Sequence, residues 1–256
     1  MAITAIEYSL IRSLRRYDRL PLGGDVLEIG EANWYGDVGL QDLRQDIGLY
    51  AAEDRRDALI QALDDLVRRE PPALFEIAKL FWQTFLRPKS LTAIDLHGGA
   101  DALKLDLNEP VDLGRRFDLV INFGTIEHVF NVARALQTVH DHTRPGGLML
   151  HGMPLSGWVD HGFYSFNSTF YFDLARANGY GVESVLYTEL DPLKIVQLAD
   201  REAILRLSKT GGIGPNSLLY AVLRRPQQAA PFRTPMQGYY EGALTGEAAL
   251  AWKHDR

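Results

Sequence analysis

Short apolar runs that alternate with helix-like stretches are the feature of this 256-residue sequence that most constrains its fold. Neighbouring parallel strands need a crossover connection, usually a helix, so the alternation predicts βα units and an α/β fold with a mainly parallel, seven-stranded sheet and helices on both faces. The last two predicted strands are expected to close the sheet as an antiparallel pair. The predicted strands are Val26 to Ile29, Leu91 to Ile94, Ala102 to Leu105, Leu119 to Phe123, Leu148 to Met153, Val182 to Tyr187 and Leu218 to Leu223.

The expected organisation is one main domain over residues 1–230 and a tail over 231–256 rich in proline, glutamine and glycine. About sixty residues separate the first two strands, which is too long for one crossover and indicates an insertion over about 40–88. Its apolar stripes are helical, and Pro71 and Pro72 divide them. The insertion is either a helical hairpin packed on the sheet or a lid over a pocket.

Composition excludes several classes of function. The formal charge of -6 disfavours a nucleic-acid partner, and the absence of cysteine excludes disulfides, thiolate metal sites and a cysteine nucleophile. The N-terminal segment has the spacing of an amphipathic first helix, and its charges interrupt any signal-type core. No stretch approaches the roughly twenty apolar residues of a membrane span, so we expect a cytoplasmic protein with no membrane partner.

Ligands in open parallel sheets collect outside the carboxyl ends of the strands, which makes the residues after each run the candidates. Gly30 follows the first run, where a backbone free of Cβ allows close approach, and Glu28 offers a carboxylate to an ammonium group. Asp95 follows the second run and can accept hydrogen bonds from both hydroxyls of a ribose. Asp106 follows the third and is suited to an adenine amino edge. A tight turn at Gly30 and a turn-initiating Asp106 are the structural alternatives.

The fourth run is the most informative, because FDLVINFGTIEHV over Phe117 to Val129 leads from an apolar strand into a helix-like segment. With the Arg-Pro-Gly-Gly turn at Arg144 to Gly147 and the strand LMLHGMP after it, this segment resembles the class I S-adenosylmethionine-dependent methyltransferases. The similarity is to their broad small-molecule branch, of the type 11 and 12 kind. It extends over about half of the chain, from Val26 to Gly30 and from Leu91 to Pro154.

The resemblance implies a Rossmann-like enzyme of small-molecule biosynthesis. Its cofactor would be S-adenosylmethionine and its product S-adenosylhomocysteine. It further implies that specific residues border the parts of the cofactor. These are Glu28 and Gly30 at the methionine part, Asp95 with Leu96 at the ribose, Asp106 with Leu107 at the adenine, and Asn122 with Phe123 beside the sulfonium.

One departure from the family is the loop after Gly30, where Glu31 to Tyr35 replaces the usual Gly-x-Gly run. Trp34 or Tyr35 in that loop is placed either to stack near the sulfonium or to pack against a neighbouring helix. The departure keeps open an alternative from another class, a non-catalytic or repurposed protein of this fold that acts as a binding or scaffold subunit. The absence of G-x-G-x-x-G after the first strand argues against a nicotinamide-dependent oxidoreductase.

Methyl transfer requires an aligned acceptor and removal of a proton. His128 is the preferred base because imidazole accepts a proton near neutrality; the alternative is a capping or packing role. His151 and His161 are rivals, and His161 lies in a polar, aromatic loop with Tyr164. The histidines at 140 and 142 stand late in a predicted helix, where cations suit the helix end, so no metal site is predicted.

These assignments depend on one spatial expectation. Gly30, Asp95, Asp106 and Asn122 should converge on a single cleft along one rim of the sheet. The identity of the small-molecule acceptor, and whether oxygen, nitrogen or carbon is methylated, stays open. The tyrosine-rich tail raises the possibility of a homodimer.

Overall fold

A seven-stranded sheet forms the centre of the computed structural model, which describes residues 1–71, 73–244 and 246–254. Four adjacent strands pair in parallel, and the three that follow pair antiparallel, so that five of the seven strands run in one direction. In spatial order they are β4 (Ser90–Ile94), β2 (Asp25–Ile29), β5 (Phe117–Phe123), β6 (Thr143–Ser156), β9 (Ser217–Arg224), β7 (Gly181–Glu189) and β8 (Lys194–Gln197).

Six of the seven predicted strands are confirmed, and so is the antiparallel pairing of the last two, β7 and β9. The predicted strand from Ala102 to Leu105 is wrong, because only an isolated parallel bridge between Ile94 and Leu103 forms there. The alternating charges of this segment leave Leu103 and Leu105 more than a third exposed, so it gains little by pairing further. The seventh strand is instead β8, at the opposite edge of the sheet.

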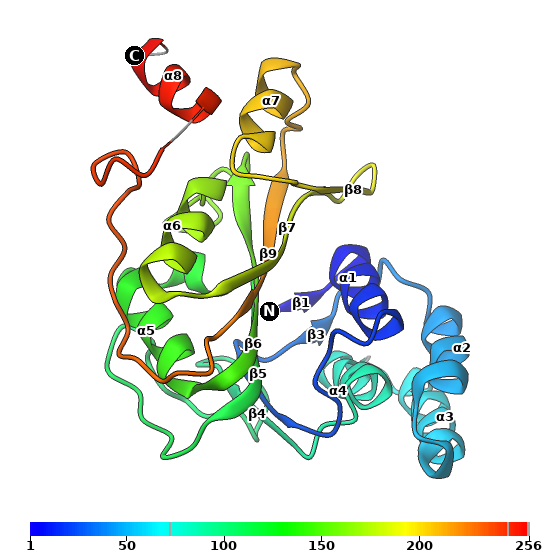
Figure 1. The fold of residues 1–256 in the computed structure, drawn as a ribbon. Helices are drawn as coiled ribbons and strands as arrows, with labels where there is room; N and C mark the ends of the chain where they lie inside the picture. Colours follow the sequence, from blue (N-terminus) through cyan, green and yellow to red (C-terminus); the bar gives the residue numbers. More distant parts are fainter. Residues whose placement is uncertain (72, 245, 255–256) are drawn as a thin grey trace.

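Helices cover both faces of the sheet (Figure 1). The helix α1 (Ala5–Arg16) begins with a capping box, in which the Thr4 amide donates to Glu7 Oε2 at 2.8 Å. It lies on the same face as α2 (Leu40–Tyr50), α3 (Arg56–Val67) and α4 (Leu74–Phe85), and the other face carries α5 (Val132–His142), α6 (Ser168–Asn178) and the short α7 (Ala203–Lys209). The remaining elements are β1 (Ala2–Ile3), β3 (Asn33–Trp34), the 3₁₀ turns η1 (Glu53–Arg55) and η2 (Ile126–His128), and α8 (Gly246–His254).

The insertion between the first two strands contains three helices rather than the two of a hairpin. The two predicted stripes correspond to α3 and α4, and α2 precedes them. Leu63 and Ile77 are buried as expected, whereas Val67 and Leu74 at the helix ends are largely exposed. The buried stripes pack into the same core as α1, which supports a structural role for this segment.

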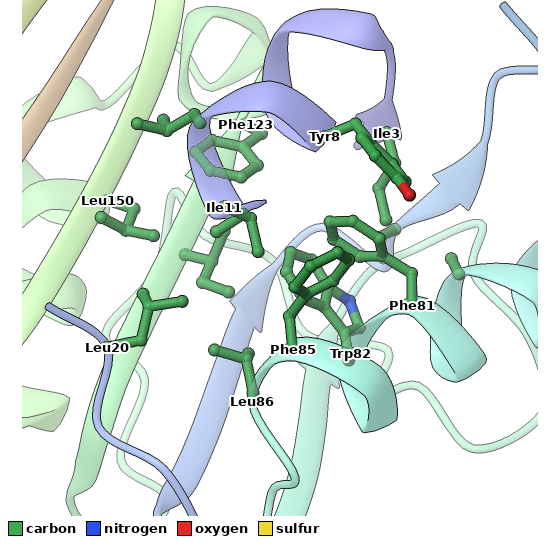
Figure 2. Close-up of a cluster of buried hydrophobic side chains, with 14 of the residues drawn as sticks. Ile3, Tyr8, Ile11, Leu20, Phe81, Trp82, Phe85, Leu86, Phe123 and Leu150 are labelled. Atoms are coloured by element: carbon green, nitrogen blue, oxygen red, sulfur yellow. The ribbon is translucent and has the colours of Figure 1, made fainter. Parts of the chain in front are cut away.

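The tightest part of that core is an aromatic cluster between α1 and α4. The Phe85 ring lies 5.7 Å from Tyr8 and 5.0 Å from Phe81, and all three side chains are buried. Figure 2 shows Phe81, Trp82 and Phe85 along α4 facing Tyr8 and Ile11 of α1. Offset and edge-to-face rings of this kind add to the free energy of burial, so α4 is fixed against the N-terminal helix.

The C-terminal segment packs along the second face before it reaches α8. The Ala230 carbonyl lies 2.8 Å from His140 Nε2, and the Gly238 amide donates to Asp173 Oδ2 at 2.9 Å. These bonds connect residues 230–238 to α5 and α6. Among the described helices, none has the length and apolar character required to cross a membrane.

Replacing Phe85 with alanine is expected to lower the free energy of unfolding by about 3–5 kcal/mol, because it removes a fully buried ring from the cluster. The matched control is Leu49→Ala on α2, where the leucine is 64% exposed, with an expected change within about 0.5 kcal/mol. Denaturant unfolding followed by circular dichroism measures both. Similar losses in the two variants would contradict the assignment of the core.

Candidate functional site

The carboxyl ends of β2, β4 and β5 meet at one edge of the sheet. Gly30, directly after β2, contacts both the end of β4 and the loop after β5. Its amide donates to the Ile94 carbonyl at 2.8 Å. Gly30 has a φ of +85°, and a Cβ at this position would lie 2.2 Å from Thr125 Oγ1. Glycine is therefore required for the turn after β2 and the loop after β5 to approach each other.

Asp95 accepts hydrogen bonds with both carboxylate oxygens at the end of β4. The Glu31 amide donates to Oδ2 at 2.9 Å, and the His97 amide donates to Oδ1 at 2.8 Å. The carboxylate is partly exposed, and it joins the loop after the first strand to the loop after the second. Asp95 thus lies at the predicted edge.

Glu31 is a residue of this edge to which sequence reasoning gave no role. Its side chain is 3% exposed and accepts a hydrogen bond from the Gly99 amide, with Lys79 Nζ at 3.5 Å. A Cβ at Gly98 would lie 2.7 Å from Glu31 Oε2, so the glycine pair makes room for this carboxylate. The consecutive glycines after Asp95 were the available signal, because they mark a loop to which another group comes close.

Glu28 is buried rather than presented to a ligand. Its Oε1 accepts hydrogen bonds from Trp82 Nε1 at 2.8 Å and from the Ala32 amide at 3.2 Å. Burial raises the pKa of Glu28 to about 7. The carboxyl group connects α4 to the turn after β2, and its predicted contact with a ligand ammonium would need this turn to open.

Asn122, at the end of β5, is fully buried. Its Oδ1 accepts from the Ile126 amide at 3.1 Å, and its Nδ2 lies 3.4 Å from His151 Nδ1. These bonds fix the turn that begins η2. Phe123 beside it is buried as well, with its ring 5.6 Å from that of Tyr220.

Asp106 lies on the loop between β4 and β5. Its Oδ1 accepts from both the amide and the side chain of Asn108, and these bonds lower the pKa of the exposed carboxyl. Asn108 in turn bonds to Asn131, which caps α5. The contacts of Asp106 match the structural alternative of a turn. Of the two leucines predicted to border the cofactor, Leu107 is buried and Leu96 is 55% exposed.

Trp34 is 2% exposed in the aromatic cluster, with its ring 6.0 Å from Tyr8 and 6.3 Å from Phe81. It therefore matches the packing alternative rather than stacking on a ligand. Of the four residues expected to converge, Gly30, Asp95 and Asn122 share the carboxyl edge of adjacent strands. Asp106 instead bonds to Asn108 within its own turn.

Beyond Asn122, three titratable side chains from two segments gather. Glu127 and His128 are consecutive in η2, and His161 belongs to the loop after β6. Glu127 Oε1 lies 3.9 Å from His128 Nε2 and 4.0 Å from His161 Nε2. Glu127 is buried, which raises its pKa to about 7, whereas the two imidazoles are each more than 40% exposed. Burial also lowers the pKa of His128, so its neutral form is favoured.

The other predicted catalytic residues are less accessible. His151 is buried next to Asn122, and burial lowers its pKa to about 4. Tyr164 donates its hydroxyl to the Phe130 carbonyl at 2.9 Å. Of the candidates for the base, His128 and His161 are the two whose rings reach the surface.

An exposed aromatic surface adjoins this cluster. Phe130 is 70% exposed and Phe163 is 64% exposed, with ring centroids 5.6 Å apart in an edge-to-face arrangement. The Tyr164 ring lies 6.2 Å from Phe163. Paired apolar rings at the surface beside titratable groups are typical of a site for a partly apolar ligand.

His140 and His142 have structural hydrogen bonds instead of a ligand-binding arrangement. His140 Nδ1 lies 2.6 Å from the Tyr180 hydroxyl and its Nε2 lies 2.8 Å from the Ala230 carbonyl. His142 accepts from the Leu113 amide with Nε2, and its Nδ1 lies 2.8 Å from the Thr138 carbonyl. Both imidazoles use both ring nitrogens within the protein.

Comparison with known proteins gives one match in sequence. A profile of methyltransferase domains matches residues 51–195, more than half of the chain. A search of curated protein sequences returned no match.

Among solved structures, the N-methyltransferase NodS from Bradyrhizobium japonicum WM9 in complex with S-adenosylhomocysteine is 13% identical; the alignment covers 87% of this chain and 89% of NodS, with a TM-score of 0.44. The 1,6-didemethyltoxoflavin-N1-methyltransferase from Burkholderia thailandensis is 15% identical, over 85% of this chain and 77% of that chain, with a TM-score of 0.42. An S-adenosylmethionine-dependent methyltransferase from Mesorhizobium loti is 15% identical. The alignment covers 86% of this chain and 98% of that chain, with a TM-score of 0.44.

The raised pKa of Glu28 makes stability depend on pH. Between the ordinary value of 4.5 and about 7, the folded chain holds a proton that the unfolded chain releases, so the free energy of unfolding falls as pH rises through this window. Wild type should lose up to about 3 kcal/mol more than Glu28→Gln between about pH 5 and 7.5. Urea unfolding at both pH values measures this. The ionisation of Glu127 changes the stability of both proteins equally. Equal losses of unfolding free energy in wild type and Glu28→Gln would therefore show that Glu28 is already ionised at the lower pH.

Proposed function

This chain belongs to the methyltransferase domain family, and on that basis we propose that it transfers a methyl group from S-adenosylmethionine to a small-molecule acceptor. The observation that carries the proposal is the meeting of the ends of β2, β4 and β5 at one edge, with His128 directly beyond the last of them. An edge of this kind is where α/β sheets bind their ligands.

The charge of this edge suits a cationic cofactor. Two carboxylates that accept from backbone amides, Asp95 and Glu31, lie along it, and Lys79 Nζ is 3.5 Å from Glu31 Oε1. Glu28 and Glu127 are buried, and burial raises the pKa of each to about 7, so each carries only part of a negative charge near neutrality. A sulfonium and an ammonium group would be attracted by these carboxylates, whereas the pyrophosphate of a nicotinamide dinucleotide would be repelled.

Individual groups match parts of S-adenosylmethionine. Asp95 has two acceptor oxygens, which in the complex would hold the ribose hydroxyls in place of backbone amides. Gly30 lets the turn after β2 and the loop after β5 come together, and the methionine part would lie beside this turn. In the bound state the cofactor supplies a methyl group on a good leaving group, so the protein contributes alignment, exclusion of water and proton removal.

Methyl transfer would form the bond between the acceptor and the methyl carbon while the carbon–sulfur bond breaks, with that electron pair left on sulfur as the thioether. One proton would leave the acceptor. His128 is suited to receive it, since its ring is partly exposed and burial lowers its pKa, which keeps it neutral near pH 7. Phe130 and Phe163 offer an apolar surface next to it, so we propose an acceptor that carries an apolar ring.

S-adenosylhomocysteine is expected to stabilise the protein by about 2.7 kcal/mol at a concentration one hundred times its Kd. Asp95→Ala should weaken this binding at least tenfold, because both ribose hydroxyls lose their acceptor. Asp54→Ala, an exposed aspartate in η1, is the matched control and should bind as wild type does. Isothermal titration of the three proteins measures the affinities. Wild-type affinity in the Asp95 variant would remove the assigned ribose site.

Turnover is expected with small acceptors that carry a hydroxyl or amine on an apolar ring, detected by mass spectrometry as S-adenosylhomocysteine together with the methylated acceptor. His128→Ala should lower kcat by about 10²–10⁴-fold while the affinity for S-adenosylhomocysteine is retained. Undiminished turnover in this variant would exclude His128 as the group that removes the proton.

A further inference from the structure

Glu127, His128 and His161 present three metal-ligating atoms to one point. Each residue offers one such atom, and all three atoms lie within 4.8 Å of one another. The Glu127 oxygen is 3.9 Å from one imidazole nitrogen and 4.0 Å from the other. Ligands of a tetrahedral zinc ion with bonds of about 2.0–2.1 Å lie roughly 3.4 Å apart, so small side-chain rotations would close the set.

The backbone holds the two contributing segments together. The Phe163 amide donates to the Glu127 carbonyl at 2.9 Å, which fixes the loop of His161 against η2. A Cβ at Gly162 would lie 3.0 Å from the Glu127 carbonyl oxygen, so glycine permits this approach. Trp158 anchors the start of the loop through its indole, which donates to the Ser217 carbonyl at 3.1 Å.

A second observation points to a ligand at this position. Glu127 is 1% exposed, and its Oε2 has no hydrogen-bond partner among the described residues. The other carboxylate oxygen, Oε1, is the one that faces the two imidazoles. A buried carboxylate with an unsatisfied oxygen is costly, and most such groups in proteins are paired or bind a metal.

We propose that Glu127, His128 and His161 bind one divalent transition-metal ion. Two imidazole nitrogens with one carboxylate favour zinc, iron, cobalt or manganese over magnesium and calcium, which prefer all-oxygen sites. Three protein ligands leave at least one coordination position open.

The consequence for catalysis rests on the proposed function. Phe130 and Phe163, the surface assigned to the acceptor, each lie two residues along the chain from a histidine of the set, so the open position suits an acceptor oxygen. With the ion bound, His128 would be a ligand, and the ion would lower the pKa of the acceptor hydroxyl so that its proton could leave to water. Without the ion, His128 would be free to receive the proton itself.

The test uses the full chain, freed of metal with a chelator and titrated with Zn²⁺ by calorimetry. We expect one ion per chain, and at least a tenfold weaker affinity in Glu127→Gln and in His161→Asn. His97→Ala, an exposed histidine on the loop after β4, is the matched control and should bind as wild type does. Co²⁺ should in addition give visible absorption bands that are lost in His161→Asn.

Because His161 is partly exposed, its variant is expected to fold, and circular dichroism checks this. Zn²⁺ affinity that is equal in wild type and the His128→Ala/His161→Asn double variant would overturn the proposal. The titration is independent of methyl transfer. Loss of S-adenosylhomocysteine binding with Zn²⁺ binding intact would contradict only the proposed function, and the reverse result would contradict only the metal site.

Discussion

The parallel register of β2 with β4 and β5 is the constraint on which the rest of this structure depends. Because Ile29 pairs with Ile94 and Glu28 with Ile121, the three strands end level with one another and deliver their following loops to a single edge. Gly30 then allows two of these loops to touch, through a backbone geometry that a side chain would block. The buried carboxyl of Glu28 strengthens the arrangement, since it accepts a hydrogen bond from Trp82 and so joins the edge to the aromatic core. Figure 2 shows Trp82 in that core.

Much of the fold could be predicted from the sequence because buried strands need apolar runs of the right length. The run before Asn122 and the run before Gly30 both meet that need, and both form strands. The segment at Leu103 does not form a strand, because tertiary packing buries Ala102 but leaves Leu103 and Leu105 more than a third exposed, and the charged Lys104 stands between them. In the same way β8 is short and half exposed, so its pairing with β7 depends on a turn rather than on an apolar pattern.

The candidate site was predictable only in part. Strand order places Asp95 and Asn122 at the carboxyl edge of the sheet. Any sequence with apolar strands in these positions would place the residues that follow them at the same edge. Which groups they bond could not be inferred, because Asp95 accepts from Glu31 and Asn122 from Ile126 through turns whose shape is set by distant contacts. The gathering of His161 with Glu127 was hidden for the same reason. More than thirty residues separate them, and Gly162 and Phe163 determine how closely the loop approaches.

The acidic groups at this edge are of two kinds, which differ in whether their oxygens have hydrogen-bond partners. Asp95 and Glu31 are bonded by backbone amides, which stabilises their charge and lets them hold the loops in place. Glu127 is buried with one oxygen unpaired, and burial works against its ionisation. A chain whose net charge is already negative does not gain stability from such a group. A cation bound between it and the two accessible imidazoles, as proposed above, would remove the cost that the fold alone leaves uncompensated.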